Sequence, residues 1–487
     1  MMKKETFISA SLALMVLSGC RQEVEKPNIL FLLVDDMQSA AIAALGNKGI
    51  YTPNIDGLIE EGVTFTRTYT NGALCGALSM PSRAMLLTGR GVFEIQSDGM
   101  KIPKDHITLP EHLRASGYRT FGTGKWHSDK ASFNRSFAEG ENIFFGGMHR
   151  YEENGHCSPR LRHYDVTGAY EGEAFVGDKF SSEMFADAAI NFLKSTREDK
   201  NPFMAFVSFT SPHDPRNQLP DYGKKYTAAE MALPANFLPE HPFDNGELSI
   251  RDELLLPPPR TAEQVKGELA LYYGMVSEVD VQIGRVLEAL EATGERDNTI
   301  IVFASDNGLA MGQNGLLGKQ NLYDHSVGVP MLIVNPHAVR KGEKTEALCY
   351  LYDIYPTLCE LVGLDIPESV TGRSLKHVME GTADKHREDI FLAYSNQQRG
   401  LVKDGYKYII YNVEGKITEQ LFDLKSDSGE LVNLAADDPE KTAGYRILLS
   451  QRMKENRDFC SLDNPLWWKD GRKLTWDELI NLYIFEK

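Results

Sequence analysis

The sequence predicts an α/β fold: a large, mostly parallel or mixed sheet sandwiched by helices, followed by a smaller C-terminal α+β subdomain of short antiparallel strands and a helix. Three observations support this prediction. Apolar runs of strand length alternate with segments of helical periodicity. One such segment repeats apolar residues every three or four positions from Val265 to Leu290, which predicts a long helix packed on the sheet. After about Glu388, short alternating strands dominate.

Four of the strand-like runs end in polar residues. The runs NILFLLVDD, YRTFGTGKWH, PFMAFVSFTSPHDPR and TIIVFASDNG end in Asp35 and Asp36, in Lys125 and His127, in His213, and in Asp306 and Asn307. In open α/β sheets, ligands bind outside the carboxyl ends of the strands. Each residue taken alone is compatible with a turn or a solvated loop. Their joint placement predicts one shared site.

The first 20 residues resemble an export signal. Lys3 and Lys4 precede the apolar run FISASLALMVL, which ends in Leu-Ser-Gly-Cys at Cys20. This pattern predicts a lipoprotein whose lipidated Cys20 anchors it to a membrane, in the periplasm or at the cell surface. An ordinary cleaved signal peptide is the alternative. The predicted division is 1–20 signal peptide, 21–387 catalytic domain and 388–487 C-terminal subdomain.

Composition limits the partners. The chain of 487 residues has a formal net charge of −17, which excludes nucleic acid because phosphate contacts need a basic surface. An anionic substrate therefore needs a local positive island. The cysteines after Cys20 show no zinc-binding spacing. Cys349 and Cys359 fall in one predicted helix, too far apart to pair, so buried free thiols are expected.

The polar strand ends predict a metal and an oxyanion. Asp35, Asp36, Asp306 and Asn307 offer hard oxygen ligands, which suit Ca²⁺ or Mg²⁺ better than Zn²⁺. The predicted positive island consists of Arg83, Lys125, His127, His213 and Lys319. Such a set fits a sulfate or phosphate ester.

The stretch LSMPSRAMLLTGR predicts a helix start. Pro81 is favoured in a first helical turn, so Ser79 should lie near the helix N-terminus with Arg83 one turn further on. Backbone amides and the helix dipole favour an anion there. The alternative is a capping serine with a surface arginine.

These residues together resemble the type I sulfatases of the alkaline phosphatase superfamily, and the bacterial carbohydrate sulfatases in particular. Ser79-Met80-Pro81-Ser82-Arg83, followed by Leu87-Thr88-Gly89-Arg90, resembles the sulfatase signature, whose first residue is converted to formylglycine after translation. The blocks GTGKWH, SPHDP, SDNG and GLLGKQNLYDHS resemble further family blocks in order. The resemblance extends from about Asn28 to the C-terminal stretch LFDLKSDSGELVNLA.

The resemblance implies a role for each position. A maturation enzyme would convert Ser79 to formylglycine (3-oxoalanine), and Arg83 would fix it. One Ca²⁺ would be held by Asp35, Asp36, Asp306 and Asn307, and the sulfate would be surrounded by Lys125, His127, His213 and Lys319. One hydroxyl of the aldehyde hydrate would attack sulfur, with His127 as base for the later elimination. Either His213 or Lys319 would protonate the leaving sugar oxygen.

The expected substrate is a sulfated oligosaccharide or polysaccharide cut at a chain end. We expect Asp214 and Arg216, two residues apart on an extended backbone, to select a terminal hexose of galactose or N-acetylgalactosamine type. A local salt bridge between them is the alternative. Gln397 and Arg399 could also reach the sugar, or could belong to an ordinary polar loop.

Two other functions stay open. A phosphate or phosphonate ester hydrolase of the same superfamily is one, although Asn307 and the calcium-type ligands disfavour a two-metal site. A lipoprotein that binds sulfated glycans, with Ser79 never converted, is the other.

Overall fold

A large mixed sheet forms the centre of the molecule. The structure is a computed structural model that describes residues 26–197, 201–458, 460 and 462. The sheet order is β13 (Glu343–Thr345), β2 (Val63–Phe65), β12 (Met331–Val334), β10 (Thr299–Ser305), β1 (Asn28–Val34), β9 (Phe203–Ser208), β5 (Arg119–Lys125) and β6 (Glu139–Phe144). The strands from β10 to β6 run parallel, while β12 is antiparallel to β10 and β2. The predicted sheet is therefore confirmed.

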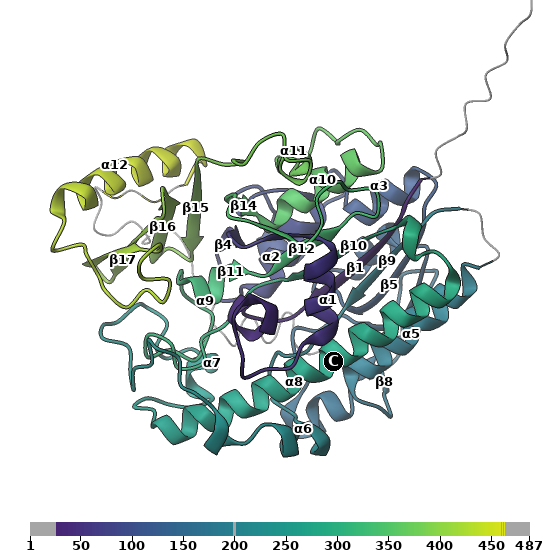
Figure 1. The fold of residues 1–487 in the computed structure, drawn as a ribbon, viewed down its shortest axis with the longest axis horizontal. Coiled ribbons are helices and arrows are strands. Elements are labelled where there is room, and N and C mark those ends of the chain that lie inside the picture. Colours follow the sequence, from purple (N-terminus) through teal and green to yellow (C-terminus); the bar gives the residue numbers. More distant parts are fainter. Residues whose placement is uncertain (1–25, 198–200, 459, 461, 463–487) are drawn as a thin grey trace, which may run out of the picture.

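Helices cover both faces, as the alternation of side chains along β1 requires (Figure 1). Leu30 and Leu32 face a core built with α1 (Pro53–Glu61), α5 (Ser181–Ser195) and the long α8 (Ala262–Thr293). Ile29 and Phe31 face the opposite core. That second core contains residues of α2 (Ser79–Thr88), α3 (Leu109–Ala115), α4 (Lys130–Ser136) and α10 (Ile354–Leu361).

The long helix α8 confirms the predicted periodicity and extends it by three residues at each end. It begins with a capping box between Thr261 and Gln264 and ends at Gly294, whose φ of 83° is the left-handed conformation that glycine adopts easily. Its apolar stripe, which includes Leu269 and Val276, lies in the core shared with β1. The helix thus stiffens one whole face of the sheet.

The C-terminal strands form a second sheet at one side of the molecule, beneath α12 (Pro439–Glu455), drawn in yellow-green in Figure 1. Its order is β18 (Lys416–Asp423), β17 (Tyr406–Val413), β16 (Gln398–Lys403), β15 (Asp389–Tyr394) and β4 (Gly72–Ala73). The strands after Asp389 pair antiparallel, as predicted. β4 was not predicted: it comes from the N-terminal part of the chain and pairs parallel with β15.

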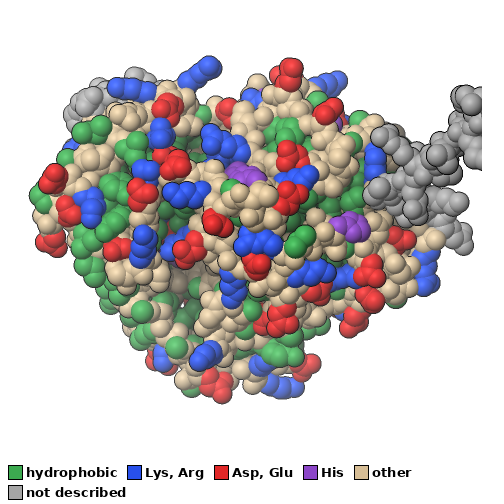
Figure 2. Space-filling model, turned by 45° about the horizontal axis from the view of Figure 1, so that its top comes forward, with side chains coloured by type: hydrophobic (Ala, Val, Ile, Leu, Met, Phe, Trp, Pro, Cys, Tyr) green, Lys and Arg blue, Asp and Glu red, His purple; other side chains and the backbone are tan. Residues whose placement is uncertain are grey.

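Figure 2 shows this small lobe at the left, marked off by a notch at the upper edge, with acidic and basic side chains interspersed over the visible face. The exact domain division stays a prediction. Cys20 and the export signal lie outside the described residues. Within residues 26–197 and 201–458, no helix combines the length and apolar character that a membrane crossing requires.

The cysteines of the described chain are free thiols, as expected. The prediction of one helix through Cys349 and Cys359 is wrong, because Cys349 lies in β14 (Cys349–Tyr350) and only Cys359 lies in α10. Burial raises the pKa of the Cys359 thiol to about 12. It therefore stays protonated and packs as a small apolar side chain.

Candidate active site

The acidic residues meet where β1 and β10 end. Val34 pairs with Ser305 as the last residues of these parallel neighbours, so the residues that follow each strand lie side by side. The backbone N–H of Asp36 donates to Asp306 Oδ1 at 3.2 Å, and Asn307 Nδ2 donates to Asp36 Oδ1 at 2.6 Å. The φ of 68° at Asp36 turns the chain sharply after the strand.

Ser79 enters this group from the start of α2. Leu78 is the N-cap residue, so the hydroxyl of Ser79 is not spent on capping and instead donates to Asn307 Oδ1 at 2.9 Å. Asp35 Oδ1 lies 3.3 Å from the same hydroxyl oxygen. The side chain is only 2% exposed. The alternative of a capping serine is therefore wrong.

Arg83 is buried one turn further along α2, not on the surface. Its Nε donates to Asp306 Oδ2 at 2.8 Å, and its Nη1 donates to Ser208 Oγ at 2.6 Å. Among the described residues, its Nη2 has no hydrogen-bond partner, and it lies 3.9 Å from Asp35 Oδ1. A buried donor without a partner is costly, which points to a missing acceptor in this site.

Two lysines complete the charge balance. Lys125, the last residue of β5, donates from Nζ to Asp35 Oδ2 at 2.6 Å. Lys319 donates from Nζ to Asp36 Oδ1 at 2.5 Å and to Ser79 Oγ at 3.1 Å. Burial acts to lower the pKa of Lys319, but Asp36 and neighbouring carboxylates outweigh burial and raise that pKa. Lys319 therefore keeps its positive charge beside the serine hydroxyl.

The two histidines differ in their surroundings. His127 follows β5 in a left-handed conformation, with a φ of 62°. Burial and nearby Lys125 hold the pKa of His127 well below its ordinary value, so its imidazole is neutral. Its buried Nδ1 has no hydrogen-bond partner among the described residues. His213 contacts the carbonyl oxygen of Asp214 through Nδ1 at 2.8 Å, and its Nε2 lies 3.6 Å from Asp36 Oδ2.

The predicted calcium ligands fit a hard divalent cation. Asp35 and Asp306 are fully buried, and Asp36 is 3% exposed. Burial and the neighbouring Asp35 raise the pKa of Asp306, as expected where carboxylates lie close together and away from solvent. A cation would relieve this repulsion. Ligand atoms of Asp35, Asp36 and His213 lie within 4.8 Å of one another, so the structure adds a possible ligand that the sequence had assigned to the sulfate.

Asp214 and Arg216 do not form the local salt bridge that was the alternative to sugar binding, because each contacts a different partner; their predicted contact with a sugar stays a prediction. Both terminal nitrogens of Arg251, in α7 (Arg251–Leu254), donate to the carboxylate of Asp214. Burial acts to raise the pKa of Asp214, but these contacts hold it below its ordinary value. Arg216 instead donates to Glu268 Oε2 on α8 at 2.6 Å. The sequence offered no signal for Arg251, which comes from a different segment.

The prediction that Arg399 could reach the sugar is wrong. Its side chain is fully buried on one face of β16, where Nε donates to Asp458 Oδ2 at 2.5 Å. Gln398 points to the other face and donates from Nε2 to the carbonyl oxygen of Asn245 at 3.1 Å. Gln397, just before the strand, has a buried Oε1 without a hydrogen-bond partner among the described residues, so it stays a candidate.

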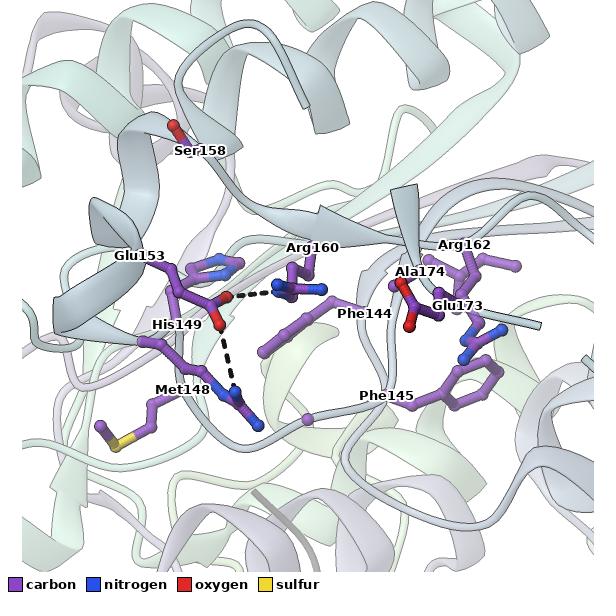
Figure 3. Close-up of a pocket in the computed structure, with 13 residues that line it drawn as sticks. Phe144, Phe145, Met148, His149, Glu153, Ser158, Arg160, Arg162, Glu173 and Ala174 are labelled. Atoms are coloured by element: carbon purple, nitrogen blue, oxygen red, sulfur yellow. Dashed lines mark hydrogen bonds and ion pairs between the residues drawn. The ribbon is translucent and has the colours of Figure 1, made fainter. Parts of the chain in front are cut away.

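A separate cavity of about 370 Å³ lies beyond the end of β6, one strand from Lys125 (Figure 3). Phe144 and Phe145 form apolar walls, and Arg160 and Arg150 both donate to Glu153. The predicted site residues do not line it. It adjoins the candidate site through His149, whose Nε2 is 3.0 Å from Thr210 Oγ1 in the loop that leads to His213.

Comparisons with known proteins find families, relatives and structures that this chain resembles. The family model described as Sulfatase matches residues 27–364, and the model described as N-sulphoglucosamine sulphohydrolase, C-terminal, matches residues 312–458. An N-acetylglucosamine-6-O-sulfatase of Bacteroides thetaiotaomicron is 28% identical, over 92% of this chain and 90% of its own. An ulvan-active sulfatase of Formosa agariphila is 29% identical, over 74% of this chain and 66% of its own.

Two solved structures share the fold. One is a complex with its substrate D-glucosamine-2-N,6-O-disulfate, with a TM-score of 0.70, 25% identity, and coverage of 89% of this chain and 98% of that chain. The other is a phosphonate monoester hydrolase of Agrobacterium radiobacter, with a TM-score of 0.69, 24% identity, and coverage of 88% and 96%. The second likeness concerns the fold alone.

Proposed function

Because the chain belongs to the sulfatase family and is a sulfate ester hydrolase, we propose that it removes sulfate from a carbohydrate by means of a formylglycine formed from Ser79. One observation carries the proposal. The Ser79 hydroxyl lies between the oxygen-rich ends of β1 and β10 and the positive Lys319, where an anionic ester would meet both ligand oxygens and cations.

Formylglycine would supply a hydrated aldehyde with two geminal hydroxyls, one to attack sulfur and one to release sulfate. The chain's own residues supply the rest. Arg83 holds Asp306 in place, and its Nη2, which has no hydrogen-bond partner among the described residues, can donate to an acceptor. Lys125 and Lys319 offer ammonium donors to oxyanion oxygens. Neutral His127, whose Nδ1 has no hydrogen-bond partner in the part of the chain that the structure describes, can accept a proton.

The proton for the leaving sugar oxygen can come from His213 Nε2 or Lys319 Nζ. His213 uses Nδ1 for the carbonyl of Asp214, which orients Nε2 toward Asp36. Calcium would be held by Asp35, Asp36, Asp306 and Asn307 and would add positive charge next to the sulfate oxygens. The gathered, buried carboxylates support this choice.

A terminal sugar is the proposed target. The catalytic side chains are all deeply placed, with His213 at 8% exposure the most open of them, and such a recess suits a chain end better than a chain interior. We propose a galactose- or N-acetylgalactosamine-type residue. The name of the relative, N-acetylglucosamine-6-O-sulfatase, indicates N-acetylglucosamine as the competing sugar, which a substrate panel should include.

Export completes the proposal. A lipid anchor at Cys20 would hold the enzyme in the periplasm or at the cell surface, where polysaccharides are met, and the maturation enzyme would be its partner before folding.

The test combines intact mass with product analysis. Conversion of Ser79 to formylglycine removes two hydrogens, so a converted chain should be about two mass units lighter than the same chain with an unconverted serine. Matured protein should release sulfate from sulfated mono- and disaccharides and leave matched phosphate and phosphonate esters almost untouched. Faster turnover of a phosphonate ester would favour the alternative hydrolase, and an unconverted serine with tight glycan binding would favour the binding protein.

A further inference from the structure

A closed ring of polar contacts passes through the candidate site and consists of seven residues: Asp36, His213, Asp214, Arg251, Asp252, Gln320 and Lys319. The first half runs outward from Asp36. His213 Nε2 lies 3.6 Å from Asp36 Oδ2, and its Nδ1 lies 3.4 Å from Asp214 Oδ1. Asp214 Oδ1 accepts from Arg251 Nη1 at 2.9 Å, and Arg251 Nη2 binds the other carboxylate oxygen.

The second half returns to the start. Arg251 Nη1 also donates to Asp252 Oδ1 at 3.1 Å, and Gln320 Nε2 donates to Asp252 Oδ2 at 2.8 Å. The backbone N–H of Lys319 donates to Gln320 Oε1 at 2.9 Å, and Lys319 Nζ reaches Asp36 at 2.5 Å. The ring therefore links Asp36, His213 and Lys319 of the candidate site to residues from segments far apart in sequence.

The side of the ring away from Asp36 consists of Asp214, Arg251, Asp252 and Gln320, which we call the outer arc. Its most open side chain is Arg251, at 19% exposure, whereas those of Asp214 and Asp252 are 8% and 10% exposed. Two carboxylates flank one guanidinium, so the arc has a formal charge of −1. The inner side of the site is less negative, since Lys125, Lys319 and Arg83 balance the charges of the three carboxylates they contact there.

We propose that the outer arc determines substrate selectivity: it accepts hydroxyl groups beside the sulfated carbon and rejects a second sulfate or a carboxylate there. This inference rests on the proposed function. A sugar hydroxyl can donate to Asp214 or Asp252 and accept from Arg251, which matches the mixed donors and acceptors of the arc. A second anion would meet the net negative charge of the arc, because one guanidinium balances only one of the two carboxylates that it contacts.

The direct test compares two sugars that differ in one group. The substrates are a hexose with a single sulfate and the same hexose with a second sulfate on the adjacent carbon, and the measured quantity is kcat/KM for sulfate release by the matured enzyme. The wild type should prefer the monosulfated sugar by about tenfold or more. A preference for the disulfated sugar would overturn the inference.

Two variants should shift this preference in opposite directions. Asp252→Asn removes one negative charge and keeps an acceptor for Gln320 or Arg251, so the preference should fall about threefold or more. Arg251→Gln leaves two carboxylates without their guanidinium, so the preference should rise. Because each result is a ratio of two substrates in one variant, general damage to the fold cancels.

The matched control is Glu268→Gln, which removes a carboxylate bound to Arg216 on α8, outside the ring. Its preference should equal that of the wild type. If Asp252→Asn and Arg251→Gln also leave the ratio unchanged while sulfate is still released, the selectivity inference fails and the proposed function stands. If matured wild type releases no sulfate from any sulfated sugar or aryl sulfate, the proposed function fails and the inference with it.

Discussion

Ser79 and Arg399 show why some site residues could be predicted and others could not. Ser79 is part of a sequence pattern whose spacing already places it at a helix start, and its hydroxyl lies among the predicted acids. Whether Arg399 could reach the site depended on which face of a strand its side chain occupies, and a shift of one position reverses that face. Its neighbour Gln398 points toward Asn245, while Arg399 pairs with Asp458.

Replacing the nucleophile should separate activity from folding. Ser79→Ala should abolish sulfate release, because no aldehyde can form, while the thermal transition followed by circular dichroism should move by only a few degrees. Ser79→Cys should restore turnover in a host whose maturation enzyme accepts cysteine. Wild-type rates in Ser79→Ala would rule out the nucleophile assignment.

Glu278 offers a test of pH-dependent stability away from the site. Burial in α8 raises the pKa of Glu278 to about 7, although Gln282 donates to its Oε1 at 2.9 Å. The folded chain therefore keeps this proton up to about neutral pH while the unfolded chain releases it near its ordinary value, so this residue makes the free energy of unfolding fall as pH rises through that window. Glu278→Gln removes the effect.

The expected result is that Glu278→Gln gains stability relative to wild type between pH 5 and pH 8, by at most about 3 kcal/mol. Denaturant unfolding at both pH values measures the gain. Glu288→Gln, an exposed position on the same helix, should show a constant difference from wild type. A constant difference for Glu278→Gln as well would contradict the prediction.

At the scale of elements, the long and strongly patterned segments were predictable and the short ones were not. α8, β1 and β10 are long enough that their apolar patterns alone predict a helix or a strand. β4 contains only Gly72 and Ala73, and it becomes a strand because β15 lies beside it. The Asp214 to Arg251 pair likewise depends on tertiary packing, since α7 has only four residues and no motif.

Gly72 should be the position where β4 tolerates least change. Its φ is 97°, and a Cβ there would lie 1.9 Å from the carbonyl oxygen of Ala393. Gly72→Ala should therefore destabilise the chain by about 2–4 kcal/mol, seen as a lower denaturation midpoint. Gly57→Ala in α1, where a Cβ meets nothing within 4 Å, should be neutral or stabilising. Equal midpoints for the two variants would refute the close approach.

At the scale of the whole molecule, a chain with a net charge of −17 concentrates three buried carboxylates in its candidate site. That the predicted oxygen ligands meet could be predicted from the sequence, because they follow two strands that adjoin in the sheet; the metal itself stays a prediction. The presence of His213 in the site was predicted, but its place among possible metal ligands was not, since that depends on how the loop after β9 folds back.

Calcium removal should affect both activity and stability. Chelation should abolish sulfate release and lower the thermal midpoint, and added Ca²⁺ should restore both, because the ion binds only the folded arrangement of ligands. Calorimetry with and without chelator gives the second readout independently of turnover. Full activity in excess chelator would exclude the calcium site.

The pairing of β4 with β15 has a consequence for the order of events during synthesis. β4 lies only a few residues before Ser79, yet its partner strand is made more than three hundred residues later. The β4 segment, which leads into the helix of Ser79, therefore cannot pair with β15 until most of the chain has been made. In the folded chain Ser79 is 2% exposed. An enzyme that modifies Ser79 therefore needs the chain before folding is complete, so slower translation of the last third of the gene should lengthen the time available for it.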